Sequence, residues 1–455
     1  MFKDLYRGFF NSELFIDYVT NAVHPKTWMC GDWQKAFLSV AGNEFFEHMH
    51  ENHDYWKFID KLKPLSIWKL KTYQKHELYD KLVERLAKEM PQRQELPNQI
   101  IHTLEELNKT PEILTIGFAR RFATYKRAHL IFIDLKRLAS IVNNPQYPVR
   151  FIFSGKAHPS DKAGEDLIKR IIEVSRMPEF IGKIIFVENY DTELAKLLLK
   201  GVDVWLNTPT RPLEASGTSG MKAVMNGTLN FSVLDGWWAE GYVPGGGWAL
   251  RQENTYDDPN LQDQLDAEMI YSTIEDEIVP SFYERDIEGV PQKWIEMIKN
   301  AYFHIAPHFI TKRMLLEYDN KFYKQLFEYY KTLSDNDYQN LFKFISWKRK
   351  IYRNWDEIKL ENIEMFDSSK RHLPLGDKFY VKLLLDLKEL KPDDVIIELI
   401  FGKKEEGRIV DIEFAKTFDF VGCEGSKSKY ECTIPMEQSG VYNFSIRLRP
   451  QHPLL

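Results

Sequence analysis

The segment with the most reactive side chains runs from Arg211 to Lys222 and reads RPLEASGTSGMK. It follows an apolar run and opens a helical pattern, so its small residues let a phosphate group approach backbone N–H groups where the helix begins. Glu214 can accept hydrogen bonds from the hydroxyl groups of a polyol. Lys222 would lie one turn inside the helix, where partial desolvation favours the neutral amine that Schiff-base formation needs. The alternative is a glycine-rich turn followed by a solvated lysine.

A second charged segment, RRFATYKR from Arg120 to Arg127, follows another apolar run. Arg120, Arg121 and Lys126 concentrate positive charge in a chain whose formal net charge is -6. Guanidinium groups bind phosphate through two parallel hydrogen bonds, and an ammonium group adds a point charge. Because cations at the start of a helix oppose its dipole, this placement favours a bound anion over a solvated basic helix start.

Other catalytic motifs are weaker. Ser219-Gly220-Met221-Lys222 fits the S-x-x-K pattern of serine acyl enzymes and 334–336 reads SDN, but no KTG accompanies them and the SDN falls in a helical pattern. The sequence has no P-loop, no HExxH and no Cys/His cluster with zinc spacing, so we predict no metal site. Its abundant carboxylates show no spacing that singles out a glycosidase pair.

The elements that must position these residues alternate between strand and helix. Continuous apolar runs predict strands at 113–117, 149–155, 183–187, 202–206 and 228–233. Helical patterns lie between them, at 125–142, 160–176 with Ser160 as N-cap, 191–200 and 215–225. Such alternation predicts an α/β fold with a parallel sheet covered on both faces. Ligands bind beyond the carboxyl ends of strands in these sheets, where the segment after 113–117 falls.

Three regions follow from the change of pattern along the chain. Residues 1–110 form a helical and irregular junction segment, 111–350 the α/β lobe with its C-terminal helices, and 351–455 an all-β accessory domain. Alternating residues predict strands in the last region at 379–387, 395–401, 409–414 and 441–448, arranged as in a sandwich.

Composition narrows the class of protein further. A chain of 455 residues with 44% hydrophobic and 28% charged residues is globular rather than disordered. Its net negative charge argues against nucleic acid or an anionic membrane as the main partner. Three cysteines are too few for a disulfide framework, and we find no signal peptide or transmembrane run, so we expect a cytoplasmic protein with reduced, mostly buried thiols. The 14% of aromatic residues serve either as sugar platforms or as an aromatic-rich core.

At these motifs the chain resembles the α-glucan (glycogen, starch and maltodextrin) phosphorylases, from Val19 to about Lys348. The motifs that carry the resemblance are Glu214-Ala215-Ser216-Gly217-Thr218 with Met221-Lys222 and Asn226-Gly227, Tyr125-Lys126-Arg127, Glu188-Asn189-Tyr190, and Asp235-Gly236. The tail is similar to the extra C-terminal domain of the short bacterial branch. The resemblance implies a Rossmann-like, doubly wound lobe of a GT-B type glycosyltransferase, followed by an all-β, sandwich-like domain.

The resemblance also implies roles for individual residues. Lys222 would hold pyridoxal 5′-phosphate, and the remaining cofactor contacts would be Arg120, Thr218, Ser219, Tyr190 and Trp28. Arg121 and Lys126 would bind the substrate phosphate. The sugar would be held or approached by Glu214, Ser216, Gly217, Asn21 and Tyr125. Lys222, Arg121, Lys126 and Glu214 form the implied catalytic set.

The implied reaction is phosphorolysis of terminal α-1,4-glucosidic bonds. Inorganic phosphate would release α-glucose 1-phosphate from an α-1,4-glucan while the cofactor phosphate assists proton transfer. Two departures, Ser219-Gly220 for the usual Gly-Asn and Asp191 for a common Arg, are marks of the short branch.

A larger departure is that this sequence contains no counterpart of the N-terminal lobe of the family, so we expect a cofactor-bearing half whose partner is either a separate N-terminal lobe or further copies of this chain. Two other functions stay open: a nucleotide-sugar glycosyltransferase of the same fold, and an inactive fragment that binds glucan or cofactor.

Overall fold

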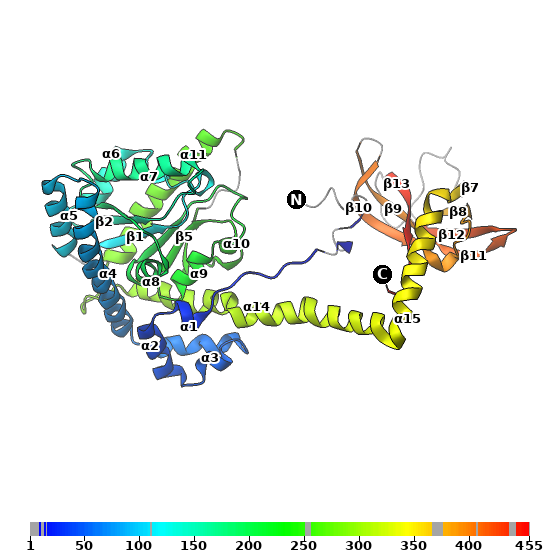
Figure 1. Ribbon diagram of the computed structural model, residues 1–455, viewed down its shortest axis with the longest axis horizontal. Helices are drawn as coiled ribbons and strands as arrows, with labels where there is room; N and C mark the ends of the chain where they lie inside the picture. Colours follow the sequence, from blue (N-terminus) through cyan, green and yellow to red (C-terminus); the bar gives the residue numbers. More distant parts are fainter. Residues whose placement is uncertain are drawn as a thin grey trace. The chain divides into compact units, whose positions relative to one another are not determined.

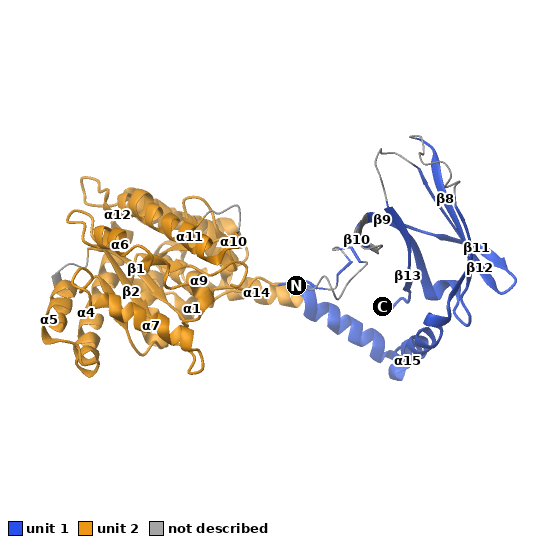
Figure 2. Cartoon of the chain, turned by 90° about the horizontal axis from the view of Figure 1, so that it is seen from above, with its two compact units in different colours: residues 1–18, 320–455 blue, residues 19–319 orange. Residues whose placement is uncertain are grey.

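The computed structural model describes residues 9–10, 13–14, 16–109, 112–250, 256–365, 376–405, 408–435 and 443–454. The chain divides into two compact units (Figure 2). One unit is Val19–Asp319, and the other combines Met1–Tyr18 with Asn320–Leu455. Within the described part of the chain, no helix combines the length and the hydropathy that crossing a bilayer requires.

A six-stranded parallel sheet forms the centre of the Val19–Asp319 unit (Figure 1). Its strands are β1 (Leu114–Ala119), β2 (Val149–Ser154), β3 (Ile184–Val187), β4 (Val204–Asn207), β5 (Leu229–Val233) and β6 (Gly247–Leu250). They lie in the order β3-β2-β1-β4-β5-β6, and every neighbouring pair is parallel. The order reverses between β1 and β4, which is where ligands bind in such sheets.

Helices cover both faces of this sheet, as the apolar strand pattern predicts. Among the described residues the α-helices of this unit are α1 (Pro25–Trp28), α2 (Gly31–Ala41), α3 (Phe45–His48), α4 (Pro64–Gln92), α5 (Pro97–Lys109), α6 (Leu135–Val142), α7 (Lys162–Ser175), α8 (Thr192–Gly201), α9 (Thr218–Val224), α10 (Trp237–Gly241), α11 (Pro259–Thr273), α12 (Val279–Tyr283), α13 (Gln292–Asn300) and α14 (Thr311–Tyr318).

The two faces of the sheet belong to different hydrophobic cores. Phe151 and Phe153 of β2 pack in a core that includes residues of α6, α7 and α11, whereas Ile152 packs in a second core with residues of α4 and α8. Successive residues of a strand point to opposite faces, so a strand buried on both sides must be apolar throughout. The prediction of an α/β fold with a parallel sheet is confirmed.

Two predicted helices differ in detail. The single helix expected at 125–142 is wrong: two short 3₁₀ turns, Thr124–Lys126 and Leu130–Phe132, precede α6. Arg127 adopts a left-handed φ of 47°, which interrupts the helix. The N-cap predicted at Ser160 is also wrong, because Asp161 caps α7 by accepting a hydrogen bond from the Gly164 N–H at 2.9 Å.

Gly201 marks the place where α8 crosses α4. A Cβ atom at this position would lie 2.5 Å from the Leu78 Cβ. We therefore expect Gly201→Ala to lower the free energy of unfolding by about 1–3 kcal/mol, as overpacking does in other cores. Gly31→Ala is the matched control because no atom lies within 4 Å of that Cβ. Urea unfolding of both variants tests this, and equal stability of the two would contradict the packing argument.

The second unit carries the predicted C-terminal β structure. Helix α15 (Lys324–Asn354), which is kinked at 335–338, leads into two antiparallel sheets. The sheets have the orders β10-β9-β13 and β11-β12-β8-β7. Their strands are β7 (Lys359–Met365), β8 (Lys378–Asp386), β9 (Val395–Glu405), β10 (Arg408–Thr417), β11 (Asp419–Glu424), β12 (Lys427–Pro435) and β13 (Asn443–Pro450). Residues of both sheets share one hydrophobic core.

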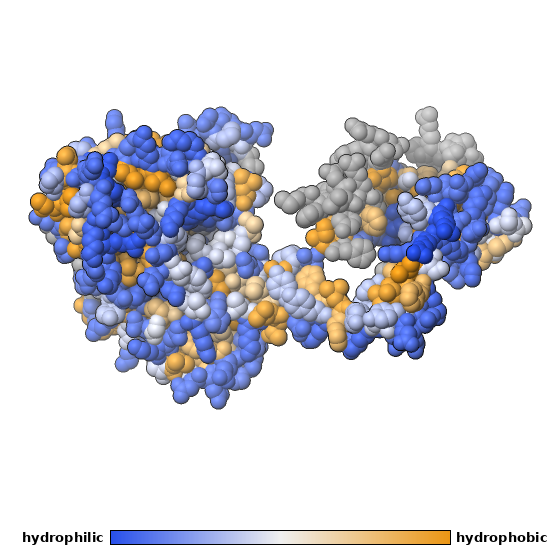
Figure 3. Space-filling view, in the orientation of Figure 1, coloured by the Kyte–Doolittle hydropathy of each residue, from blue (hydrophilic) through white to orange (hydrophobic). Residues whose placement is uncertain are grey.

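Hydrophilic side chains predominate on the visible face of the Val19–Asp319 unit, with apolar residues in small patches (Figure 3). The three cysteines are free thiols. The expectation that they are mostly buried is wrong for Cys423, which is exposed, and for Cys30, which is half-buried.

Candidate functional site

The carboxyl ends of β1 and β2 fix the main chain at Arg120. The Arg120 N–H donates to the Ser154 carbonyl at 3.1 Å. Gly155 follows with a φ of 157°, and a Cβ there would lie 1.9 Å from the Arg120 carbonyl oxygen. Because glycine alone permits this approach, the two strand ends stay close together. Main-chain contacts therefore fix the point from which the Arg120 side chain extends.

Three buried charged side chains meet at this edge of the sheet. The Arg120 Nη2 donates to Glu214 Oε2 at 2.9 Å, and Lys126 Nζ forms an ion pair with the same oxygen. Their side chains are 10%, 6% and 8% exposed for Arg120, Glu214 and Lys126, respectively. Two cations and one carboxylate leave an excess of positive charge away from water, which favours binding of an anion.

Arg120 also has hydrogen-bonding capacity to spare. Its Nε and Nη1 are buried, and neither has a hydrogen-bond partner among the described residues. Burial lowers the pKa of Arg120 despite the nearby Glu214. Ser216 Oγ at the same edge is likewise buried without a partner in the described part of the chain. Buried donors of this kind are normally satisfied, so they fit a phosphate group of a ligand.

The loop that carries Glu214 is held by the segment after β5. The Glu214 N–H donates to Asp235 Oδ2 at 2.8 Å, and the Trp237 N–H donates to the Ser216 carbonyl at 2.8 Å. Gly236 has a φ of 54°, and a Cβ there would lie 2.6 Å from the Ser216 oxygen. Asp235 and Gly236 therefore hold the main chain of the loop that carries Glu214, a role that the sequence did not indicate.

Lys222 lies on α9 in a partly dry setting. Its Nζ is 3.8 Å from the centroid of the Trp28 ring. Burial lowers the pKa of Lys222. Trp28 and Tyr190 pack against the same core, which includes Ala223 of α9. The partial desolvation predicted for this amine is confirmed, and a neutral amine is the form that condenses with an aldehyde.

Tyr190, which packs against the core beside Lys222, also lies close enough to the Arg120 guanidinium to interact with it electrostatically. The positive charge of Arg120 tends to lower the pKa of Tyr190, but burial outweighs it and raises that pKa to about 12. The phenol is therefore neutral at neutral pH and can donate a hydrogen bond. Tyr125 has its ring 4.4 Å from Lys126 Nζ, so it belongs to the cluster of charged side chains as well.

The remaining predicted site residues are placed less tightly. Arg121 and Asn21 are exposed, and Asn21 Oδ1 accepts from the Ala22 N–H at 2.8 Å. Ser219 Oγ accepts from Trp205 Nε1 at 3.1 Å. Gly217 and Thr218 form the start of α9. The structure thus unites Arg120, Tyr125, Lys126 and Glu214 in one group and Lys222 and Trp28 in another.

Sequence reasoning missed the position of Arg127, which is buried behind this edge. Its Nη1 pairs with Asp263 at 2.9 Å and its Nη2 with Asp266 at 2.6 Å. The same guanidinium donates to the carbonyls of Thr208 and Pro209, which follow β4. Arg127 therefore ties helix α11 to the end of β4. The sequence pattern that could have indicated these ion pairs is Asp263 and Asp266, two aspartates three residues apart. The same pattern is equally typical of a solvated helix face.

The lowered pKa of Lys222 has a direct consequence for its reactivity. Amines react with acetic anhydride in the neutral form, so Lys222 should reach a larger share of its maximal labelling rate at pH 8 than an exposed lysine does. Lys196 is the matched control, because it is exposed and its Nζ lies 6.0 Å from the same Trp28 ring. Trace labelling followed by peptide mapping measures both rates. Identical pH profiles would contradict the desolvation of Lys222.

Comparison with known proteins adds independent information. The family model described as carbohydrate phosphorylase matches residues 11–240, and the model described as glycogen phosphorylase C-terminal domain matches residues 355–455. The chain is 39% identical over 411 residues to a maltodextrin phosphorylase of Thermococcus litoralis, which covers 90% of this chain and 47% of the relative.

Two further relatives are glycogen phosphorylases. The protein of Aquifex aeolicus is 45% identical over 311 residues, or 68% of this chain and 44% of the relative. The protein of Mycobacterium tuberculosis is 31% identical over 459 aligned positions, which cover 100% of this chain and 52% of the relative. The chain therefore spans about half the length of the curated relatives that it matches.

Proposed function

The chain belongs to the carbohydrate phosphorylase family, and from this premise we propose that it forms the cofactor-bearing half of a GT-B type α-glucan phosphorylase. The reaction is attack of inorganic phosphate on a terminal α-1,4-glucosidic bond, which gives α-glucose 1-phosphate and a glucan shortened by one unit. The strand order β3-β2-β1-β4-β5-β6 supports a doubly wound, Rossmann-like lobe.

One observation carries the proposal: the buried Arg120 guanidinium with two N–H groups that lack partners among the described residues. Arg120 and Lys126 together outweigh the charge of Glu214, so the site favours anions. A phosphorylase must hold phosphate away from water, and unpaired buried donors accomplish this.

Pyridoxal 5′-phosphate fits the residues present. The desolvated amine of Lys222 would hold its aldehyde, and the free donors of Arg120 would bind its phosphate. Thr218, the Ser219 main chain and Tyr190 would complete that contact, with Trp28 packed beside Lys222. When bound, the cofactor supplies a phosphate group that supports proton transfer.

The chain's own residues would bind and orient the second phosphate. Lys126 and Arg121 hold the inorganic phosphate, which protonates the departing glycosidic oxygen and attacks C1 on the same face of the sugar. Two like charges 4 Å apart repel by about 4 kcal/mol at an effective dielectric constant of about 20. The excess positive charge of Arg120 and Lys126 offsets this repulsion and stabilises the charge that develops in the transition state.

Glu214 would serve two functions in this scheme. Its Oε2 is occupied by the two cations, whereas its Oε1 is the oxygen that a Cβ at Gly217 would approach to 3.3 Å. The Oε1 atom would accept a hydrogen bond from a sugar hydroxyl. Ser216, Gly217, Asn21 and Tyr125 would lie along the rest of the sugar.

A nucleotide-sugar glycosyltransferase is the second candidate, because the same strand order serves it equally well. The experiment incubates the chain with pyridoxal phosphate, maltoheptaose and inorganic phosphate, alone and together with a separately produced N-terminal half of the Thermococcus litoralis relative. We expect glucose 1-phosphate, with a higher rate in the mixture. Glucosyl transfer from UDP-glucose without glucose 1-phosphate would favour the glycosyltransferase, and no product in any mixture would indicate an inactive fragment.

A further inference from the structure

Asn226 of the Asn226-Gly227 motif is a buried residue that lies just past the end of α9. Its side-chain oxygen accepts from the Cys30 N–H at 2.9 Å. Its Nδ2 donates to the Trp28 carbonyl at 2.7 Å and to the Lys222 carbonyl at 2.8 Å. A single buried carboxamide therefore joins the end of α1 to the helix that carries Lys222.

Two other helices fix the main chain of this motif. The Asn226 carbonyl accepts from Trp33 Nε1 of α2 at 2.9 Å and from Lys71 Nζ of α4 at 3.2 Å. Gly227 has a φ of 64°, and a Cβ there would lie 2.6 Å from the Trp33 ring. Because glycine alone combines this φ with so close a contact, the turn holds Asn226 in one place.

The carboxamide sets the separation between the main chains of Lys222 and Trp28. It binds the carbonyls of both residues, and the Lys222 Nζ lies 3.8 Å from the centroid of the Trp28 ring. Burial lowers the pKa of Lys222. A displacement of the Trp28 main chain would move the ring away from the amine and admit water, which favours the charged amine.

We propose that Asn226 is a positioning residue for Lys222, which holds the Trp28 ring over the amine by joining the main chains of the two residues. Its importance for the reaction rests on the proposed function, in which Lys222 must react as a neutral amine. The same hydrogen bonds would also serve a residue that only stabilises the end of α9. The two roles predict different results for the reactivity of Lys222.

The test follows trace acetylation of Lys222 by acetic anhydride as a function of pH, in the full chain before pyridoxal phosphate is added. Asn226→Asp keeps the size of the side chain and an acceptor for the Cys30 N–H, but its carboxylate cannot donate to the carbonyls of Trp28 and Lys222. We expect the share of the maximal labelling rate that Lys222 reaches at pH 8 to fall about threefold, because water reaches the amine. Asn226→Ser keeps one donor and adds no charge, so it should cause a smaller fall, and it replaces Asn226→Asp if circular dichroism shows that variant to be unfolded.

Thr228→Val is the matched control near the same helix end. Thr228 Oγ1 donates to the Val202 carbonyl at 2.9 Å and accepts from Lys71 Nζ at 3.0 Å. Within the described part of the chain, none of the hydrogen bonds of this hydroxyl reaches Trp28 or Lys222. The variant should therefore lose stability without a change in the pH profile of Lys222.

This control also covers the other groups that titrate nearby. Burial lowers the pKa of Lys71 to about 8 and raises the pKa of the Cys30 thiol. Lys196, whose Nζ lies 6.0 Å from the Trp28 ring, is mapped in the same experiment. Because Thr228→Val alters the surroundings of Lys71, a shift that Lys71 causes would appear in the control as well.

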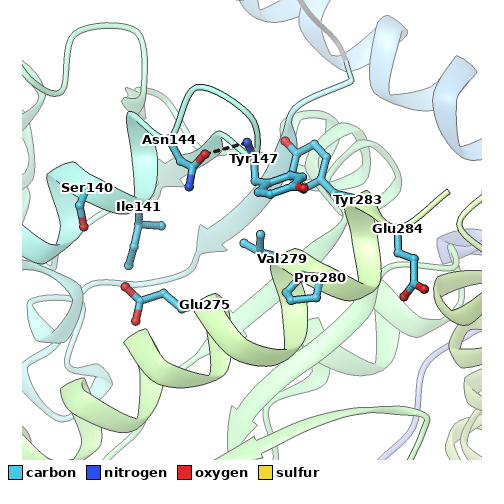
Figure 4. A pocket seen from close by; sticks show the side chains of 9 residues that line it. All are labelled: Ser140, Ile141, Asn144, Tyr147, Glu275, Val279, Pro280, Tyr283 and Glu284. Atoms are coloured by element: carbon cyan, nitrogen blue, oxygen red, sulfur yellow. Dashed lines mark hydrogen bonds between the residues drawn. The ribbon is translucent and has the colours of Figure 1, made fainter.

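A remote control measures the effect of lost hydrogen bonds in general. Tyr283 lines the cavity shown in Figure 4, and its hydroxyl donates to the Pro148 carbonyl at 2.6 Å and accepts from the Leu114 N–H at 3.1 Å. The lining of this cavity includes no residue of α1 or α9. Tyr283→Phe removes two hydrogen bonds, as Asn226→Asp does, and should leave the pH profile of Lys222 unchanged.

A double variant separates positioning from stabilisation. Trp28→Ala removes the ring and should lower the labelling share of Lys222 at least as much as Asn226→Asp does. Adding Asn226→Asp to Trp28→Ala should then change the share by less than about 1.5-fold, because residues that act on one another are not additive. Full additivity, an unchanged profile in Asn226→Asp, or an equal change in Thr228→Val would overturn the inference.

Labelling with pyridoxal phosphate and borohydride distinguishes this inference from the proposed function. In Asn226→Asp, incorporation at pH 8 should slow about threefold, with Lys222 still the labelled residue. If the unaltered chain takes up no pyridoxal phosphate, the proposed function fails. The acetylation profiles would still decide whether Asn226 positions Lys222.

Discussion

Lys222→Ala is expected to abolish the covalent attachment of pyridoxal phosphate to the chain. In the unaltered protein, treatment with pyridoxal phosphate and borohydride should label one peptide, which contains Lys222. The physical reason is the position of this amine, which lies half-buried on α9 over the Trp28 ring with its pKa lowered by burial. We expect more than a tenfold loss of label, read by absorbance and peptide mapping, because no other nucleophile replaces the amine.

The matched control for this result is Lys196→Ala. Lys196 faces the same Trp28 ring at 6.0 Å but is exposed, so its removal should leave labelling unchanged. Circular dichroism of both variants shows whether the fold is retained. Label on another lysine, or full label in Lys222→Ala, would remove the basis of the proposed cofactor.

The second large effect is expected for Glu214→Gln, which removes the shared counter-charge of Arg120 and Lys126. Breaking a buried ion pair by removing one partner costs about 3–5 kcal/mol, because the other charge stays buried. We expect Glu214→Gln to lower the free energy of unfolding by about 3 kcal/mol, the low end of this range, because an amide oxygen remains as an acceptor. Such a loss lowers the melting temperature by roughly 6 °C. Added inorganic phosphate should restore part of this loss, because an anion can occupy the place of the carboxylate.

Glu84→Gln gives the comparison at the surface. Glu84 also contacts two lysines, Lys81 at 3.1 Å and Lys88 at 3.2 Å, but its side chain is 55% exposed. Exposed ion pairs contribute about 0–1 kcal/mol, so this variant should melt within about 2 °C of the unaltered chain. Added phosphate should raise its melting temperature no more than it raises that of the unaltered chain. A Glu214→Gln variant that is equally stable and equally insensitive to phosphate would show that the cluster holds no excess charge.

Sequence patterns predicted the sheet well because its strands are buried on both faces. A continuous apolar run such as 149–155, set between regular helical patterns, is typical of a strand covered on both sides. Strand β6 was missed because Gly247–Leu250 is short and follows two glycines. Strands β7, β11 and β12 were missed for other reasons. Four of the seven residues of β7 are polar, and β11 and β12 are separated only by a two-residue turn.

Sequence patterns predicted where the candidate site lies, but they did not predict which of its side chains pair with one another. The positions of Arg120 and Lys222 relative to strand ends follow from local patterns. The pairing of Glu214 with Lys126, the hydrogen bond of Asp235 to the Glu214 N–H and the ion pair of Arg127 with Asp263 join segments that lie 21 to 136 residues apart. Local sequence carries no information about such pairs. The prediction of a single helix at 125–142 was wrong for the same reason, because the left-handed conformation of Arg127 is stabilised by its ion pair with Asp263 of α11.

The close approach of β1 and β2 at Gly155 has a consequence for engineering position 120. Main-chain bonds fix the attachment point of that side chain, so exchanging one basic residue for another changes the reach of the charge and leaves its origin in place. A saturation library at this codon would therefore sample charge placement almost independently of backbone geometry, and homologues that differ here can be compared on one common scale of side-chain length.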